Sequence, residues 1–445
     1  MRKLLLALPL IAGASWAGTT YVSSSQTQPT YDKLLSQLNQ FEPFIFESER
    51  YDKGFMQSTA ITKVMMFGDV GSKPLLRLKH VIDHSPIGVD NSGARIGANS
   101  VVTTLVIDDM DPVVAAALAG QDPLTLHTRV DISGNTINEL ELSSLNIVDN
   151  EKAINFGGGS FQFVTDSSGR VQGQGATQPL QMTNADGWEI RVAESPLSVD
   201  LRYIADALYS GHSDWRLPEI AVSNPNMGLD ISLQDFYVNS ATELDNDFLR
   251  TGISLSAGHL DAPLPVNSFN WEFYLTGLPI DGFIQYQEIT REIMSYASED
   301  EIPENMGNQM IEAYKALLAP GLTAKNTLSV GNDGGDINTE ISLSFLGDSS
   351  NSGFDYMSTV RDVLSAVTMS AKVDADIQAV NMTPLGMFAY SPPASDFIIN
   401  DGTNFTADLE FKDLLLYANG TSHDVIERFG LAQMLDQPLD FVDSF

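Results

Sequence analysis

The sequence predicts a β-rich α+β fold, in which long antiparallel meander sheets form a sandwich or a curved groove with a few covering helices. The first observation is that short segments of alternating apolar and polar residues recur along the chain, separated by Gly, Asn and Asp turn signals. The second is that helical spacing of apolar residues occurs in only a few short segments. The third is the hydrophobic fraction of 43% in 445 residues, which is enough for a sizeable core.

Residues 1–22 are predicted to be a signal peptide or an N-terminal membrane anchor. Arg2 and Lys3 precede an apolar run over residues 4–22. Ser15 and Ala17 fit the small residues of a cleavage site, which is typical of a signal peptide. The run is also long enough to cross a bilayer, as an uncleaved anchor does. Both interpretations place the rest of the chain outside the cytoplasm.

Residues 23–41 are predicted to be a linker followed by a short helix. The linker is polar and contains Pro29, and the apolar residues of 31–41 recur at spacings of three and four. Residues 51–88 then contain two extended runs, 60–66 and 76–83, with turn residues between them. We expect these runs to form the opening hairpin of a long antiparallel sheet.

The same stretch carries a family motif. Its residues are Tyr51, Gly54, Ser58, His84 and Pro86. This pattern resembles the opening of the YdgA family of Gram-negative cell-envelope proteins, although Ser85 stands where that family usually has Gly. The function of the family is not established. The resemblance therefore implies a periplasmic location, favours an anchor in the inner membrane, and implies no chemistry.

The motif residues are expected to be structural. Gly54 lies between a basic residue and an apolar pair, where a left-handed or bulged backbone is plausible. His84 and Pro86 are expected to shape a turn, with the histidine bonding to backbone groups.

The N-terminal β-rich half is predicted over residues 42–278. The expected strands are 100–107, 124–130, 137–147, 160–164, 188–192, 229–233 and 269–275, with a short helix at 112–119. The last of these strands has an aromatic face of Phe269, Trp271 and Phe273. Because strand side chains alternate between faces, these three share one side of the sheet.

Residues 279–445 are predicted to be a helical pair followed by a C-terminal β-rich half. Apolar residues recur at helical spacing over 286–296 and 306–317. The later expected elements are a helix at 355–365, strands at 337–345, 367–377 and 405–417, and a terminal helix at 425–435.

The charge of the chain disfavours anionic partners. There are 58 acidic and 24 basic residues, which gives a net charge of −34. Such a surface repels nucleic acid, and we expect no nucleic-acid partner. The absence of cysteine excludes disulfides and thiolate-based sites.

The sequence predicts no catalytic, cofactor or metal site. None of the six histidines has metal-ligand spacing, and His80 and His84 fall on a strand and its exit. Motifs for a nucleophile, a phosphate loop or a dinucleotide are absent. The acidic segments 245–247 and 333–336 lack the ligand spacing of a calcium loop and are predicted to be turns.

The one-sided strands suggest two alternatives for the apolar faces. They pack against a second sheet in a sandwich, or they line an apolar groove, with Phe269, Trp271 and Phe273 inside it. The expected function is a non-enzymatic binding or scaffold role in the cell envelope, with an apolar ligand or lipid. The alternative is a hydrolase acting on envelope glycans or esters. The expected partners are the membrane, through the N-terminal segment, and a lipid; homo-oligomer formation stays open.

Overall fold

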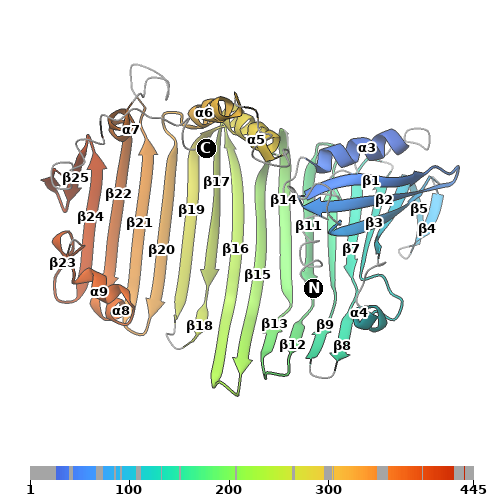
Figure 1. The fold of residues 1–445 in the computed structure, drawn as a ribbon, viewed down its shortest axis with the longest axis horizontal. Coiled ribbons are helices and arrows are strands. Elements are labelled where there is room, and N and C mark those ends of the chain that lie inside the picture. The colour runs from blue at the N-terminus through green and yellow to red at the C-terminus, as the bar shows by residue number, and fades with distance from the viewer. Residues whose placement is uncertain are drawn as a thin grey trace. The chain divides into compact units, whose positions relative to one another are not determined.

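The structure is a computed structural model whose contacts divide the chain into two units (Figure 1). Unit 1 comprises Met1–Leu229 and Met294–Glu301, and unit 2 comprises Asp230–Ile293 and Ile302–Phe445. The predicted boundary after residue 278 lies inside unit 2. The described residues are 27–39, 44–66, 74–84, 87–90, 93–106, 112–131, 133–149, 152–205, 208–262, 266–294, 303, 305–347, 359–392, 394–424 and 435. The predicted membrane segment at 4–22 lies outside them.

Unit 1 begins with a helix packed on a sheet. Helix α3 (Thr27–Leu38) is followed by strands β1 (Phe44–Asp52), β2 (Gln57–Met66) and β3 (Leu76–Asp83), which pair antiparallel. The predicted hairpin is β2 and β3, and its strands are confirmed. It does not open the sheet, because β1 precedes it. A bulge between Ser48 and Arg50 breaks the alternation of β1, and this irregularity concealed the strand in the sequence.

The apolar side of this first sheet is closed by α3. Tyr31, Leu35 and Leu38 pack against Phe44, Phe46, Ala60 and Val64, and all of them are buried. Helix α3 begins at Thr27, inside the predicted linker. Pro29 is tolerated there because the first turn of a helix does not need its N–H groups for intrahelical bonds.

The remaining strands of unit 1 also pair antiparallel. They are β4 (Ile87–Asp90), β5 (Gly93–Val106), β6 (Leu124–Asp131), β7 (Thr136–Leu142), β8 (Leu145–Asp149), β9 (Lys152–Phe156), β10 (Gly159–Thr165), β11 (Arg170–Thr177), β12 (Leu180–Thr183), β13 (Glu189–Val192), β14 (Ser195–Ala205) and β15 (Leu208–Asn224). Helix α4 (Pro112–Ala117) confirms the short helix predicted there. The predicted strand 137–147 is in fact two strands, β7 and β8, which pair with different neighbours. Leu124, Leu126, Leu140, Phe161 and Phe163 form a buried core cluster.

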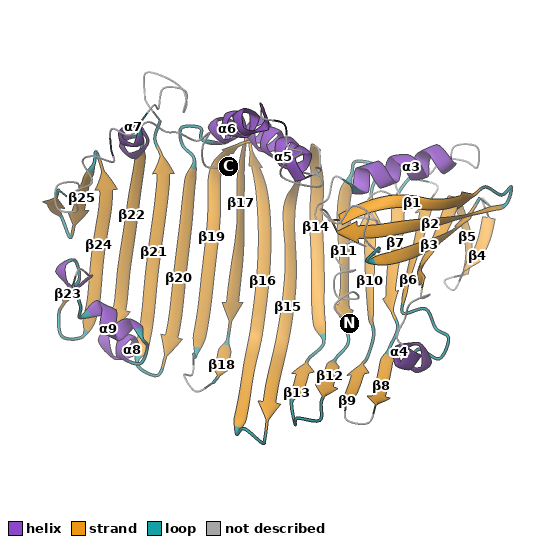
Figure 2. Cartoon of the chain, viewed as in Figure 1, coloured by secondary structure: helices purple, strands orange, loops and turns teal. Residues whose placement is uncertain are grey.

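Unit 2 is a single antiparallel sheet with helices at the ends of its strands (Figure 2). Its strands are β16 (Leu229–Asp245), β17 (Phe248–Ala257), β18 (His259–Asp261), β19 (Ser268–Pro279), β20 (Thr323–Asn332), β21 (Gly335–Phe345), β22 (Val367–Asp376), β23 (Ile399–Asn400), β24 (Asn404–Lys412), β25 (Leu415–Ala418) and β26 (Thr421–His423). Its helices are α5 (Ile280–Met294), α6 (Asn305–Leu317), α7 (Val360–Ser365), α8 (Ile377–Asn381) and α9 (Leu385–Ala389), with a 3₁₀ turn at Ala394–Asp396. Each described strand of this unit is hydrogen-bonded into the one sheet.

The helical pair predicted after residue 279 is confirmed as α5 and α6. The single strand predicted at 405–417 is wrong. It is the hairpin of β24 and β25, which turns at Asp413 and Leu414, both with positive φ. Non-glycine residues are uncommon in that conformation, and no glycine marks this turn in the sequence. The predicted terminal helix at 425–435 lies outside the described residues except for Leu435. The fold class, a β-rich α+β protein built on antiparallel meanders with few helices, is confirmed.

Candidate functional site

The predicted aromatic face is part of a larger apolar surface that spans the sheet of unit 2. Trp271 of β19 pairs with Leu255 of β17 on one side and with Leu328 of β20 on the other. Directly paired residues lie on the same face of a sheet, so the register extends this surface from strand to strand. We call it the apolar face; it comprises Val238, Ile253, Leu255, Phe269, Trp271, Phe273, Leu275, Leu328, Val330, Ile341, Leu343, Met369, Ala371, Val373, Leu409 and Phe411.

The opposite face of the same strands is polar. Its residues include Asn270, Glu272, Lys325, Glu340, Lys372 and Asp408, and Lys325 Nζ lies 2.9 Å from Glu340 Oε2. A shallow depression of about 540 Å³ lies on this side, lined mainly by polar side chains. The sheet is therefore amphipathic, with a charged and hydrated back behind the apolar face.

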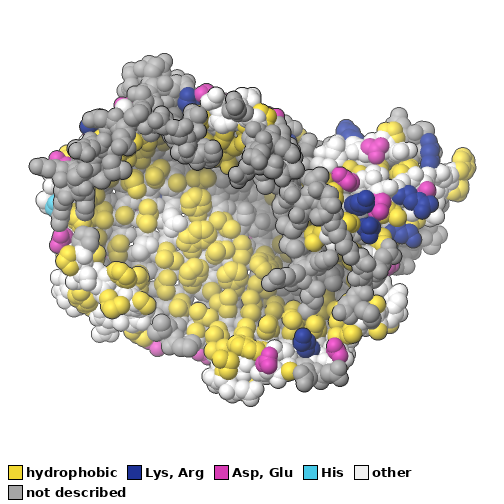
Figure 3. All heavy atoms as spheres, viewed as in Figure 1, with side chains coloured by type: hydrophobic (Ala, Val, Ile, Leu, Met, Phe, Trp, Pro, Cys, Tyr) yellow, Lys and Arg dark blue, Asp and Glu magenta, His cyan; other side chains and the backbone are white. Residues whose placement is uncertain are grey.

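Part of the apolar face, on β21 and β22, is accessible. Ile341 is 49% exposed, Met369 41% and Leu343 38%, whereas Phe269, Trp271 and Phe273 are half-buried. Figure 3 shows hydrophobic side chains gathered over these strands. In contrast, Phe161 and Phe163 in the core of unit 1 are each 4% exposed.

Only the ends of the apolar face are covered by the described helices. Ala379 and Val380 of α8 pack with Ile337, Ala375 and Phe405 at one end. Ala366, beyond α7, packs with Phe345 at the other end. Since the described strands of unit 2 all belong to this sheet, none of them forms a second layer. Among the described residues of this unit the sheet is therefore open, and its aromatic residues do not lie between two described sheets.

The aromatic residues of β19 are ordered on that surface. The rings of Trp271 and Phe273 stack with centroids 6.4 Å apart and an interplanar angle of 10°. Stacked pairs of this kind contribute about 0.5–1.5 kcal/mol beyond their buried area. The arrangement presents two flat rings side by side, next to the aliphatic residues of β17 and β20.

The family motif is brought together in the first sheet of unit 1. The Gly54 N–H donates to Ser58 Oγ at 3.2 Å, and Ser58 Oγ lies 2.8 Å from His84 Nε2. The backbone N–H of His84 donates to the carbonyl of Met56 at 2.9 Å. The ring of His84 therefore bonds a hydroxyl group, and its backbone N–H bonds a backbone carbonyl of the turn. Pro86 lies outside the described residues.

Gly54 does not adopt the left-handed conformation that the sequence suggested. The reason for glycine here is steric. A Cβ atom at this position would overlap the backbone carbonyl oxygen of Gln57. The turn between β1 and β2 therefore requires a residue without a side chain, whatever its φ.

The serine and histidine of the motif do not form a hydrolytic site. Ser58 is 1% exposed, so a substrate carbonyl cannot reach its hydroxyl. The Nδ1 atom of His84 is buried without a hydrogen-bond partner, so no acceptor orients the ring as a base. Burial also lowers the pKa of His84. The pair instead closes the turn that contains Gly54.

A second network in the same sheet was not predicted. The hydroxyl of Tyr31 lies 2.7 Å from Thr62 Oγ1, which lies 2.8 Å from His80 Nε2. His80 Nδ1 lies 2.8 Å from Thr103 Oγ1. Burial lowers the pKa of His80 to about 4 and raises that of Tyr31, so both side chains are neutral near pH 7. The only sequence signal was polar residues at inward positions of strands that are otherwise apolar.

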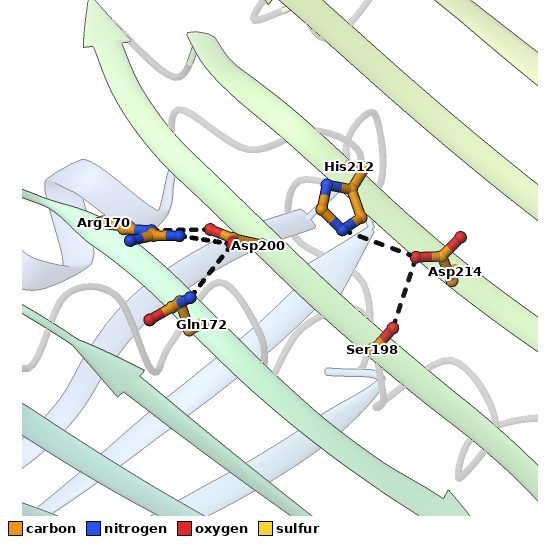
Figure 4. Close-up of polar contacts among 6 residues, drawn as sticks. All are labelled: Arg170, Gln172, Ser198, Asp200, His212 and Asp214. Carbon is orange, nitrogen blue, oxygen red and sulfur yellow. Dashed lines mark hydrogen bonds and ion pairs between the residues drawn. The ribbon is translucent and has the colours of Figure 1, made fainter.

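Polar residues on β11, β14 and β15 form another group in unit 1 (Figure 4). Arg170 donates two hydrogen bonds to Asp200, at 2.8 and 2.6 Å, and these bonds hold the pKa of that carboxyl at about 2. Asp214 lies between Ser198, at 3.5 Å, and His212, at 3.8 Å. In a catalytic triad the imidazole stands between the hydroxyl and the carboxylate. Here the carboxylate is in the middle, so this group cannot activate the serine.

The described residues contain neither a cluster of metal ligands nor a membrane-spanning helix. No group of three or more side chains there could hold a metal ion. Residues 245–247 and 333–336 lie at the β16–β17 and β20–β21 turns, as predicted. Within the same described part of the chain, no helix is long and apolar enough to cross a membrane.

Comparison with known proteins assigns a family. The model of a family described as "Bacterial protein of unknown function (DUF945)" matches residues 1–384. The chain belongs to this bacterial family. The assignment to a family of unknown function, made from the motif in residues 51–86, is confirmed, and the DUF945 match also covers β19 with its aromatic residues. No curated protein matches the chain.

Proposed function

We propose that this DUF945 protein is a non-enzymatic protein of the cell envelope that holds an apolar ligand, such as the acyl chains of a lipid, on the apolar face of unit 2. The observation that supports the proposal is the exposure of Ile341, Leu343 and Met369 on that face. Large contiguous apolar patches are rare on monomeric soluble proteins and usually mark a binding site.

The chemistry of the face favours a ligand without polar groups at the contact. Its central positions are aliphatic and aromatic, and the polar residues at register positions within it are few, such as Asn326 and Thr339. Acyl chains make no hydrogen bonds, so they lose nothing when they displace water from such a surface. The predicted export segment at residues 1–22 supports a location in the periplasm, where the chain would meet lipid.

The alternative, a hydrolase of envelope glycans or esters, receives less support. In the described part of the chain, Ser58 beside His84 lacks access, and the group of Ser198 and His212 has its carboxylate in the middle. A binding role requires only the apolar face, which is present.

A pair of substitutions on one strand tests the proposal. Ile341 lies on the apolar face, and the next residue, Ser342, lies on the polar face between Lys325 and Ser370. Ile341→Glu should abolish the lipid that remains bound to the full-length protein after detergent extraction, read by native mass spectrometry. Ser342→Glu is the matched control and should retain it.

The stability of both variants should stay close to that of the wild type, because substitutions at accessible positions usually change it by no more than about 0.5 kcal/mol. Equal lipid occupancy in Ile341→Glu and in the wild type would contradict the proposal. The absence of bound lipid from the wild-type protein would also contradict the proposal.

A further inference from the structure

The turn between β1 and β2 exposes two large apolar side chains at its tip. Phe55 is 89% exposed and Met56 is 61% exposed, which makes Phe55 the most exposed large hydrophobic residue in the described part of the chain. Both follow Lys53 and Gly54 in the family motif. The networks described above give the motif a structural role but leave this apolar pair unexplained.

The exposure of the pair is built into the turn. Ser58 binds Gly54, His84 binds Ser58, and the N–H of His84 binds the carbonyl of Met56. Glycine is the only residue that fits at position 54. These contacts hold the backbone on both sides of Phe55, whose ring is exposed in this turn.

The local charge differs from that of the rest of the protein. Residues 23–95, which follow the predicted membrane segment, contain eight of the 24 basic residues and eight of the 58 acidic ones, a net charge of zero, whereas residues 96–445 have a net charge of −36. Exposed Lys53 is next to the turn, and Lys63, Arg77 and Lys79 lie on the outward face of β2 and β3. Lys63 and Arg77 share Glu49, at 3.9 and 2.8 Å. An anionic surface therefore repels this segment less than it repels residues 96–445.

The chain also limits the distance between this sheet and the predicted membrane segment. Helix α3 begins at Thr27 and is packed on β1 and β2, and only residues 23–26 separate it from the apolar run that ends at residue 22. Five extended Cα steps span at most about 18 Å. If residues 4–22 lie in a bilayer, the start of α3 is therefore held near its surface.

We propose that the β1–β2 turn is a membrane-insertion loop. Phe55 and Met56 enter the headgroup region of a bilayer that contains anionic phospholipid, and Lys53 contacts its phosphate groups. Apolar side chains that insert at an interface, together with basic residues that stay in the headgroups, are a general mode of membrane contact. This second contact fixes the orientation of unit 1 at the bilayer and does not depend on the ligand proposed for unit 2.

The absence of cysteine allows the loop to be probed at single positions in the full-length protein. The variants Phe55→Cys and Met56→Cys are labelled with an environment-sensitive nitrobenzoxadiazole dye. They are reconstituted in vesicles of phosphatidylethanolamine and phosphatidylglycerol. The matched control is Met227→Cys, a methionine of similar exposure (70%) in the turn after β15. Phospholipids with a spin label in the upper acyl chain serve as quenchers.

Labels at positions 55 and 56 should show blue-shifted emission and should be quenched by the spin-labelled lipid, whereas the label at 227 should show neither effect. The shift should also decrease when phosphatidylglycerol is omitted or when Lys53→Glu is added. Labels at 55 and 56 that behave like the label at 227 would overturn the proposal. A blue shift that occurs without quenching, and that disappears when the protein is diluted into more lipid, would also overturn the proposal. That result indicates contact with a second copy of the protein.

Discussion

The difference between an open and a closed apolar face can be measured with two matched substitutions. Phe161 of β10 stacks on Phe163 with centroids 6.4 Å apart, and Phe273 of β19 stacks on Trp271 at the same distance. Both are phenylalanines on central strands. They differ in burial, because Phe161 is 4% exposed and Phe273 is only half-buried. Phe161→Ala and Phe273→Ala therefore compare the same chemical change in two environments.

The expected magnitudes follow from the neighbours. Phe161 is buried with Leu140 opposite, so its truncation should leave a cavity and cost about 3–5 kcal/mol. Phe273 faces Ile253 and Asn326, and its truncation opens to solvent, so no cavity term applies. The loss of partial burial and of the stack with Trp271 should cost about 1–2 kcal/mol.

Hydrogen exchange read by mass spectrometry is the suitable assay, because two units can open separately and a single melting curve would mix them. Peptides from β10 and β19 report the free energy of opening of each unit in the full-length protein. A cost for Phe273→Ala as large as that for Phe161→Ala would refute the open face. It would show that something else in the chain buries Phe273.

Two further predictions concern the first sheet of unit 1. Gly54→Ala should destabilise it by about 1–3 kcal/mol, because the new Cβ meets the carbonyl of Gln57. The control is Gly307→Ala in α6, where the space around the new Cβ is open, and it should be neutral or slightly stabilising. Equal losses of stability in the two variants would remove the steric argument. His80 binds a proton near pH 6.5 when unfolded and near pH 4 when folded, so stability should fall by at most about 3 kcal/mol as the pH drops from 6.5 to 4. In denaturation curves measured across this pH range, His80→Gln should lack the loss of stability that protonation of His80 causes in the wild type. If the stability of the variant falls with pH in parallel with that of the wild type, His80 is not the source of the pH dependence.

Alternation of residues predicted much of the fold. It located β2, β3, β19, β21 and β22, because a strand with one apolar face has a period of two whatever lies on that face. The same signal failed where the backbone is irregular, as at the bulge in β1 and the turn at Asp413 and Leu414. The bulge depends on how β1 pairs with β2, and the turn depends on the backbone conformation of two non-glycine residues. Neither feature produces a recognisable pattern in the amino-acid sequence.

The extent of the candidate site could not be read from the sequence. Phe269, Trp271 and Phe273 were identified, but Ile341, Leu343 and Met369 join them through the register of β20, β21 and β22. Nothing in alternation distinguishes a face that meets a second sheet from one that stays open. The His80 network was missed for a related reason, because Tyr31, Thr62 and Thr103 come from separate elements that only the tertiary fold brings together.

An open apolar face of this extent promotes aggregation in water unless a ligand or a partner covers it. The charge of the chain affects which of the two can do so. Two copies could bury their apolar faces against each other, but chains with a net charge of −34 repel each other at low salt. A lipid meets no such opposition when its acyl chains contact Trp271 and its headgroup stays in solvent. Native mass spectra of Ile341→Glu separate the two occupants. Loss of lipid at constant oligomeric mass supports the ligand, whereas conversion of a lipid-free dimer to a monomer supports self-association, which the sequence left open.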